Sequence, residues 1–180
     1  MSGDPTKVDF WSGADVYIAP LGSTVPTDLE TDWAAAWKPA GLLDGDEGFT
    51  WEREVDTADF FAWGGIHVKT TKSKHKRTVT VVMLEDNDVT FDVINPGSTR
   101  TTALGVTTSV VKVPESKEFM IGFEMNEGDL RKRRWVKRAA VQSVAEIKES
   151  ESNPTVYTPT IVLYPEADKT LFTELAGVIA

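Results

Sequence analysis

The sequence contains no cysteine and two histidines, His67 and His75. The first absence excludes disulfide bonds and thiolate metal sites, and two histidines eight residues apart are too few for an imidazole site. No apolar run is long enough to span a bilayer, and the first residues lack the basic and apolar parts of a signal peptide. We therefore expect no membrane partner, no metal and no cofactor, and a single domain over residues 1–180 stabilised by packing or assembly.

Catalytic motifs are also missing from the sequence. Nothing resembles the G-x-S-x-G turn of a serine hydrolase or the glycine-rich loops that bind nucleotides. The acidic run at 85–88 lacks the glycine and final glutamate of an EF-hand loop, so we interpret it as a helix-capping run. Glu52 and Glu54 would suit a glycosidase, but strand alternation produces such pairs freely. We expect that the protein is not an enzyme.

The chain has more acidic than basic residues, and the two kinds are segregated along the sequence. The formal net charge is −9, from 28 acidic and 19 basic residues, which opposes generic attraction to nucleic acid. Five of the basic residues lie within 69–77 and six within 131–138. Within 44–59, every charged residue except Arg53 is acidic. Such surfaces can be complementary between copies of the chain, or they can be ordinary solvated strand faces.

The alternation of apolar and polar residues predicts a mainly β protein, an antiparallel β-sandwich or barrel with one or two short helices and a long hairpin arm. The predicted strands span 15–20, 49–56, 77–84, 106–113, 118–125, 130–148 and 155–164, with a hairpin turn at 126–129. We expect a bulge near Ala139 and, because of Pro159, an edge position for the last strand. The candidates for these one or two helices are 31–37, 85–94 and 165–175. A strand fits 85–94 equally well, but its acidic start favours the helix.

The connection between the strands at 49–56 and 77–84 is far longer than a hairpin loop. Its large aromatic residues argue against disorder. We predict an extended hairpin arm, about 55–76, that contacts another copy of the chain, and a flexible N-terminal segment, about 1–12. The residues assigned to the arm contact are Phe60, Phe61, Trp63, Gly64, Gly65, His67, Lys69, Lys72, Lys74 and Lys76.

The six tryptophans leave two functions open. Exposed aromatic residues on a β-sandwich suit sugar stacking, and buried ones suit a core or a subunit interface. We expect Trp51 and Trp135 in the core, because they alternate with charges on predicted strands, and Trp63 at an interface. The alternative function is a non-catalytic carbohydrate-binding β-sandwich module.

Several segments together carry a family resemblance: Ala14 to Pro20; 26–37, ending in Trp37; Gly41-Leu42-Leu43 followed by 46–51; Ala62-Trp63-Gly64-Gly65; and Glu85-Asp86-Asn87. In this order they resemble the major tail protein, or tail tube protein, of long non-contractile-tailed bacteriophages, especially those that infect actinobacteria. The resemblance spans nearly the whole chain.

This resemblance implies a structural virion protein. Hexameric rings of a β-sandwich flanked by a helix would stack into the tail tube, around an acidic lumen that conducts DNA during genome ejection without binding it specifically. The implied partners are further copies of the chain, other tail proteins at the tube ends, and a tape measure protein in the lumen before ejection. The tube would be assembled in the host cytoplasm.

The predicted site residues follow from strand faces. Glu52, Glu54 and Asp56 share one face, opposite Phe49 and Trp51, and we assign this face to the lumen. The full set of predicted lumen residues is Glu52, Glu54, Asp56, Glu118 and Glu124. A basic interface is predicted at Arg131, Lys132, Arg133 and Arg134.

We expect the arm to be mobile in the free subunit, because it has little to bury against until a neighbour arrives. Hydrogen exchange on the monomer should show faster exchange at 57–76 than in the core strands. Equal protection of the two regions would contradict the prediction.

Overall fold

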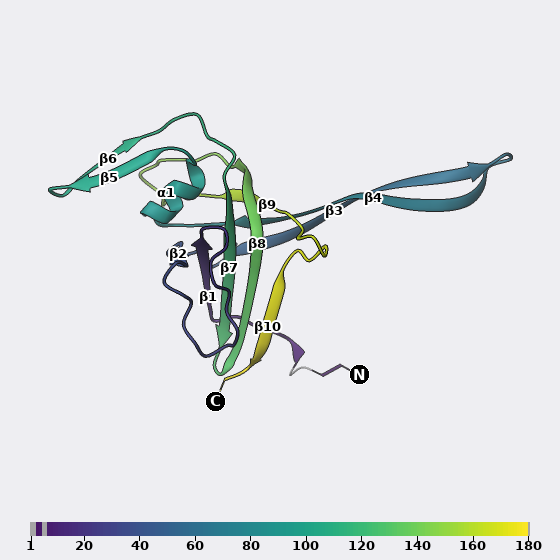
Figure 1. The fold of residues 1–180 in the computed structure, drawn as a ribbon, viewed down its shortest axis with the longest axis horizontal. Helices are drawn as coiled ribbons and strands as arrows, with labels where there is room; N and C mark the ends of the chain where they lie inside the picture. The colour runs from purple at the N-terminus through teal and green to yellow at the C-terminus, as the bar shows by residue number, and fades with distance from the viewer. Residues whose placement is uncertain (1–2, 5–6, 180) are drawn as a thin grey trace.

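The computed structural model describes residues 3–4 and 7–179 (Figure 1). Over these residues it is mainly β, with antiparallel pairing between the strands and one short helix, as predicted. The strands are β1 (Gly13–Ala19), β2 (Lys38–Pro39), β3 (Phe49–Ala62), β4 (Ile66–Val81), β5 (Thr99–Ala103), β6 (Val106–Val110), β7 (Glu118–Glu127), β8 (Leu130–Val144), β9 (Pro159–Leu163) and β10 (Thr173–Val178), and the helix is α1 (Asp88–Ile94).

Strand β8 organises the main sheet. The strand order is β2-β1-β7-β8-β9-β4-β3, and β10 also pairs with β8. One edge of β8 pairs with β7, whereas the other edge is shared: its first half pairs with β10 and its second half with β9. Because β8 carries three partners, the sheet can divide beyond it and enclose a core.

The main core lies where β3 and β4 run across β7 and β8 (Figure 1). The Phe123 ring of β7 lies 4.9 Å from Phe49 and 5.0 Å from Trp51, centroid to centroid. The predicted alternation of β7 is confirmed on this side, since Phe119, Ile121, Phe123 and Met125 are all buried. The period-two pattern therefore positions β7 as the centre of the core.

The opposite face of β7 is buried as well. Met120, Gly122 and Glu124 lie beneath the segment 20–37, which crosses this face. A Cβ atom at Gly122 would lie 2.4 Å from Trp33 Cη2, so the tryptophan can approach only a glycine. The helix predicted at 31–37 is wrong. The carbonyl oxygen of Thr31, which a helix would bond internally, instead accepts from Arg133.

Helix α1 confirms the choice of helix at 85–94. The Asn87 side chain caps it by accepting from the backbone N–H groups of Val89 and Thr90, at 2.9 Å each. An asparagine N-cap satisfies donors that the first turn leaves free. The helix begins at Asp88, so the acidic run places a carboxylate in the first turn, as its sequence predicts.

Further assignments differ from the predictions. The helix predicted at 165–175 is wrong, because 165–172 form a loop and 173–175 begin β10, which pairs with β8. Strand β9 is internal, between β8 and β4, and Pro159 is tolerated as its first residue. Strands β2 and β5 were not predicted. The β7–β8 register shifts between Phe119 and Ile121, opposite 137–138, close to the predicted bulge.

The described part of the N-terminal segment lies against the β7–β8 turn. The Phe10 N–H donates to Glu127 at 3.1 Å, and the Ser12 N–H donates to the Asn126 carbonyl at 3.0 Å. Residues 1–2 and 5–6 of the segment predicted to be flexible lie outside the described residues.

Phe123→Ala tests the core. Phe123 is fully buried, at 0% exposure, so the substitution should lower the free energy of unfolding by about 3–5 kcal/mol. The matched control is Phe60→Ala on the arm, where 56% exposure predicts a change of about 0.5 kcal/mol or less. Urea denaturation measures both, and equal losses would contradict this assignment of the core.

Candidate intersubunit surfaces

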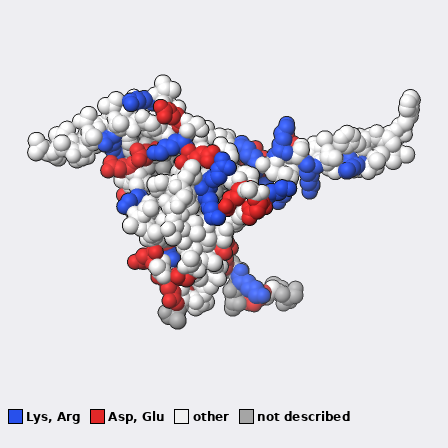
Figure 2. Space-filling view, in the orientation of Figure 1, with Lys and Arg blue, Asp and Glu red and all other residues white. Residues whose placement is uncertain are grey.

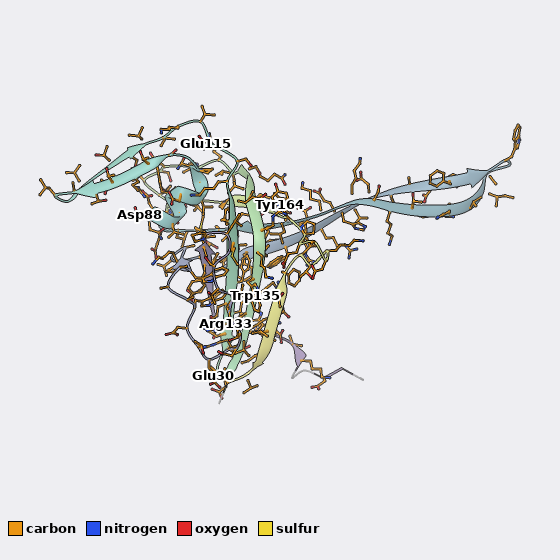
Figure 3. The ribbon with its side chains drawn as sticks, in the orientation of Figure 1. Glu30, Asp88, Glu115, Arg133, Trp135 and Tyr164 are labelled. Atoms are coloured by element: carbon orange, nitrogen blue, oxygen red, sulfur yellow. The ribbon has the colours of Figure 1, made fainter. Side chains whose placement is uncertain are left out.

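The predicted long hairpin arm is present as one continuous hairpin. Strands β3 and β4 stay paired from Phe49↔Val81 to Ala62↔Ile66, so the long connection is itself strand. The turn at its end contains Gly64 and Gly65, at φ 90° and 80°, values that glycine adopts without steric cost. The arm projects from the body with no other described part of the chain beside it (Figures 1 and 3).

The end of the arm is apolar and exposed. Trp63 is 102% exposed, and its neighbours share this exposure; we define the arm tip as Phe60, Phe61, Trp63, Ile66 and Val68. Exposed apolar clusters of this kind mark contact sites, and tryptophan is enriched among the residues that dominate binding. The arm tip is therefore the first candidate surface.

Polar contacts between the strands hold the arm weakly. Lys74 pairs with Asp56 at 3.0 Å and Lys76 with Glu54 at 3.4 Å. Near the tip, Asp59 accepts from the Thr70 hydroxyl at 2.6 Å and lies 3.3 Å from His67 Nε2. Exposed ion pairs contribute about 0–1 kcal/mol each, so the arm is shaped in advance but gains little stability from them.

A second hairpin, β5–β6, projects to the other side of the body (Figure 1). Leu104 at its turn is 105% exposed. At its base, both Arg100 guanidinium ends donate to Asp86, at 2.8 Å each, and the guanidinium lies over the Phe91 ring. These hydrogen bonds from Arg100 hold the pKa of Asp86 below its ordinary value. The contact fixes the hairpin to the start of α1.

A groove with a volume of about 550 Å³ lies between β1, β7, α1 and the segment 20–37. We name it the β1–α1 groove. Its walls are mainly apolar and include Ile18, Leu21, Val93 and Phe119. Asp92 and Glu115 lie at its polar side, and Glu115 follows β6, so the groove adjoins the second hairpin (Figure 3).

A buried ion pair holds the segment 20–37 in place. Arg133, whose side chain is 2% exposed, donates to Glu124 at 2.7 Å and to the Asp28 carbonyl at 3.1 Å. Arg131 donates to the Leu29 carbonyl at 2.8 Å, and the Trp33 indole N–H donates to Glu124. We name Glu124, Arg131, Arg133 and Trp33 the buried polar cluster.

Burial also affects a neighbouring acid. Asp15 of β1 is the register partner of Glu124. Partial burial, and next the charge of Glu124, raise the pKa of the Asp15 carboxyl.

The family model described as phage tail tube protein matches residues 1–173. The chain belongs to the phage tail tube protein family. It is therefore a structural protein of the phage tail.

Solved structures support the fold. Seventeen chains match significantly, among them a chain from the sheath–tube complex of an extracellular contractile injection system in the extended state. That chain has 10% sequence identity and a TM-score of 0.50, over 92% of this chain and 88% of the other. At this identity the likeness shows a shared fold alone. No curated protein sequence matches the chain significantly.

In this tail tube protein most predicted lumen acids are paired with bases. Glu54 and Asp56 pair with lysines of β4, and Glu118 accepts two hydrogen bonds from Arg138, both at 2.9 Å, which lower the pKa of Glu118. Glu124 is buried in the polar cluster. Glu52 is exposed and has no ion pair among the described residues.

The structure does not place these five acids on one surface. Glu52, Glu54 and Asp56 keep their common face on β3, because the register shift between Glu54 and Asp56 has its extra residue in β4, but Glu118 lies on β7 and lines the β1–α1 groove. Glu124 faces the segment 20–37, which buries its carboxylate. Sequence alternation identified the faces of β3 and β7 but gave no signal of the segment that covers β7.

The four residues of the predicted basic interface all have partners within the chain. Arg131 and Arg133 hold the segment 20–37, Lys132 pairs with Asp9 at 2.9 Å, and Arg134 pairs with Glu174. Arg133 is buried, so it is unavailable to a neighbouring copy in this conformation. Its role here is internal (Figure 3).

Two observations bear on other site types. Among residues 3–4 and 7–179, no three His, Asp or Glu side chains lie where they could share a metal ion. The described helix is too short and too polar to cross a membrane.

Glu124→Gln tests the buried polar cluster. Loss of the carboxylate leaves the Arg133 charge buried without its counter-ion, and breaking a buried pair in this way costs about 3–5 kcal/mol of unfolding free energy. The control Glu52→Gln, at an exposed site, should change it by about 0.5 kcal/mol or less. Urea denaturation measures both, and hydrogen exchange should show faster exchange at 28–33. A loss near zero at Glu124 would contradict the role of the cluster.

Proposed function

We propose that this chain assembles into hexameric rings that stack into the tail tube, whose lumen conducts DNA during genome ejection. The observation that carries the proposal is the arm. It extends beyond the body and ends in an apolar tip that has nothing to pack against in a single copy. In a chain of the tail tube family, another subunit is the natural partner for such a surface.

Ring formation would cover the unpaired edges of the main sheet. Within the described residues, β2 and β3 are terminal strands of the main sheet. Unpaired strand edges favour aggregation, and closing a barrel between subunits removes them. A cyclic ring uses heterologous contacts, so different surfaces of one subunit meet. The two hairpins on opposite sides of the body fit this requirement.

The proposed lumen face contains Glu52, Glu54 and Asp56 of β3, whereas Glu118 lines the β1–α1 groove and Glu124 is buried under the segment 20–37. Acidic and basic side chains alternate around the root of the arm in the view of Figure 2. The lysine partners therefore reduce the negative electrostatic potential of this face, while the net charge of −9 still disfavours phosphate binding. DNA could pass such a wall without specific contacts.

The tail is of the long non-contractile type, the tube is assembled in the host cytoplasm, and a tape measure protein fills the lumen before ejection. Other tail proteins cover the tube ends. Lys132 and Arg134, which are partly exposed, remain candidates for contacts between subunits.

A second candidate function, a carbohydrate-binding module, rests on Trp63 alone. This side chain is fully exposed, as a sugar-stacking residue would be. Trp33, Trp37, Trp51 and Trp135, however, pack against the two core clusters. An isolated tryptophan at the exposed end of a two-stranded hairpin is a poor platform for a sugar, and we favour assembly.

Electron microscopy of the purified protein at rising concentration tests the proposed function. We expect hollow tubes or rings of uniform diameter, and a reconstruction should show six-fold symmetry with Glu52 and Glu54 toward the lumen. Tubes with both residues on the outer surface would contradict the lumen assignment. A monomer at every concentration that binds glycans, and loses binding in Trp63→Ala, would favour the carbohydrate-binding module instead.

A further inference from the structure

We propose that the arm tip of one copy binds in the β1–α1 groove of the next copy. The inference rests on the proposed function and adds to it the receiving surface for the arm. It joins two apolar features of the same chain, one convex and one concave, that have no partner in a single copy.

The two features match in chemistry. The arm tip presents aromatic and aliphatic side chains, and the groove is walled by Ile18, Leu21 and Phe119. Its volume of about 550 Å³ falls in the range of roughly 300–1,000 Å³ that encloses compact ligands. The groove therefore has room for aromatic side chains from the end of a two-stranded hairpin.

Charge favours one orientation of the arm. Lys69 and Lys72 follow the tip on β4 and have no ion pair within the described part of the chain. Asp92 and Glu115 at the groove are also without ion pairs among these residues. Lysines that approach α1 would meet these two carboxylates.

The opposite orientation is disfavoured by bases on the other part of the rim. Lys38 and Lys117 also line the groove and would repel the lysines of the arm. The charges therefore determine which way round the docked arm lies in the groove, whereas the apolar contact supplies the affinity.

The positions of the two features require a contact between copies. The arm and the α1 side of the body point in opposite directions (Figure 1). The root of the arm pairs with β9 and packs in the core, so the arm cannot turn back to its own groove. A contact between unlike surfaces is heterologous and repeats from copy to copy, giving a ring or a stack.

The surface beside the groove extends the apolar contact. Val110, Val111 and Val113, at the end of β6 and just beyond it, are exposed and lead to Glu115. A docked arm could cover these valines as well as the groove. This continuity gives the second hairpin a role in the same interface.

Engineered disulfides test the contact, because the chain has no cysteine of its own. Ala62→Cys at the arm tip and Ala36→Cys on the groove wall replace two exposed alanines. In assembled protein under mild oxidation, we expect intermolecular bonds between positions 36 and 62, seen as a ladder on a non-reducing gel and confirmed by peptide mapping. Ala62→Cys with Ala167→Cys, an exposed alanine outside the groove, is the control and should give no ladder.

The outcomes separate this inference from the proposed function. Tubes that form without the 36–62 bond would overturn the groove as the receiver and leave the tube function intact. A wild-type chain that never assembles would overturn both. A control ladder as strong as the test ladder would overturn the specificity of the contact.

A groove-filling substitution gives a second, independent measurement. Ala36→Trp should fill the groove and raise the concentration needed for assembly by roughly 30-fold or more, the loss of one dominant interface residue. Ala35→Trp, at the adjacent exposed alanine that does not line the groove, should leave assembly unchanged. Urea denaturation should show equal stability of both variants. Equal assembly of the two would overturn the inference.

Discussion

Burial of both faces of β7 is the constraint on which the other surfaces depend. One face packs on Phe49 and Trp51, and the other is covered by an irregular segment that brings Glu124 and Arg133 out of water. A buried charge is tolerated only when it is paired and hydrogen-bonded, and backbone carbonyls of the covering segment supply the remaining acceptors. The ion pair thus fixes the segment, and the segment forms one wall of the β1–α1 groove.

The arm, in contrast to β7, is exposed on both faces. Its strands gain backbone hydrogen bonds along their whole length but bury almost nothing beyond the body. A two-stranded hairpin is marginally stable in water at best, so the arm depends on its root in the core and on whatever it contacts outside. An apolar tip on such an element has a clear energetic reason to bind, and this reason exists only between copies.

The sequence predicted the elements whose signals are local. The alternation in β7 specifies a strand, and the acidic run at 85–88 favours the helix that α1 forms. The segment with Trp33 and Trp37 was wrongly predicted as a helix, because its conformation is set by Arg133 and Gly122, some 90 residues or more away. The helix predicted at 165–175 was wrong for the same reason, because the pairing of β10 with β8 overrode a weak local preference for helix. The groove was not predictable, because it exists only once four distant segments meet.

Solubility before assembly sets a further requirement on the arm. A long hairpin has two free edges and an apolar end, which would promote pairing with any other strand. Lysines at intervals along β4 and register shifts at Glu54 and Phe60 interrupt a flat edge, and both devices oppose edge-to-edge association. Their effect is to leave the tip as the productive contact. Because the same lysines complement carboxylates beside the groove, one set of charges can oppose incorrect pairing and also favour the correct partner.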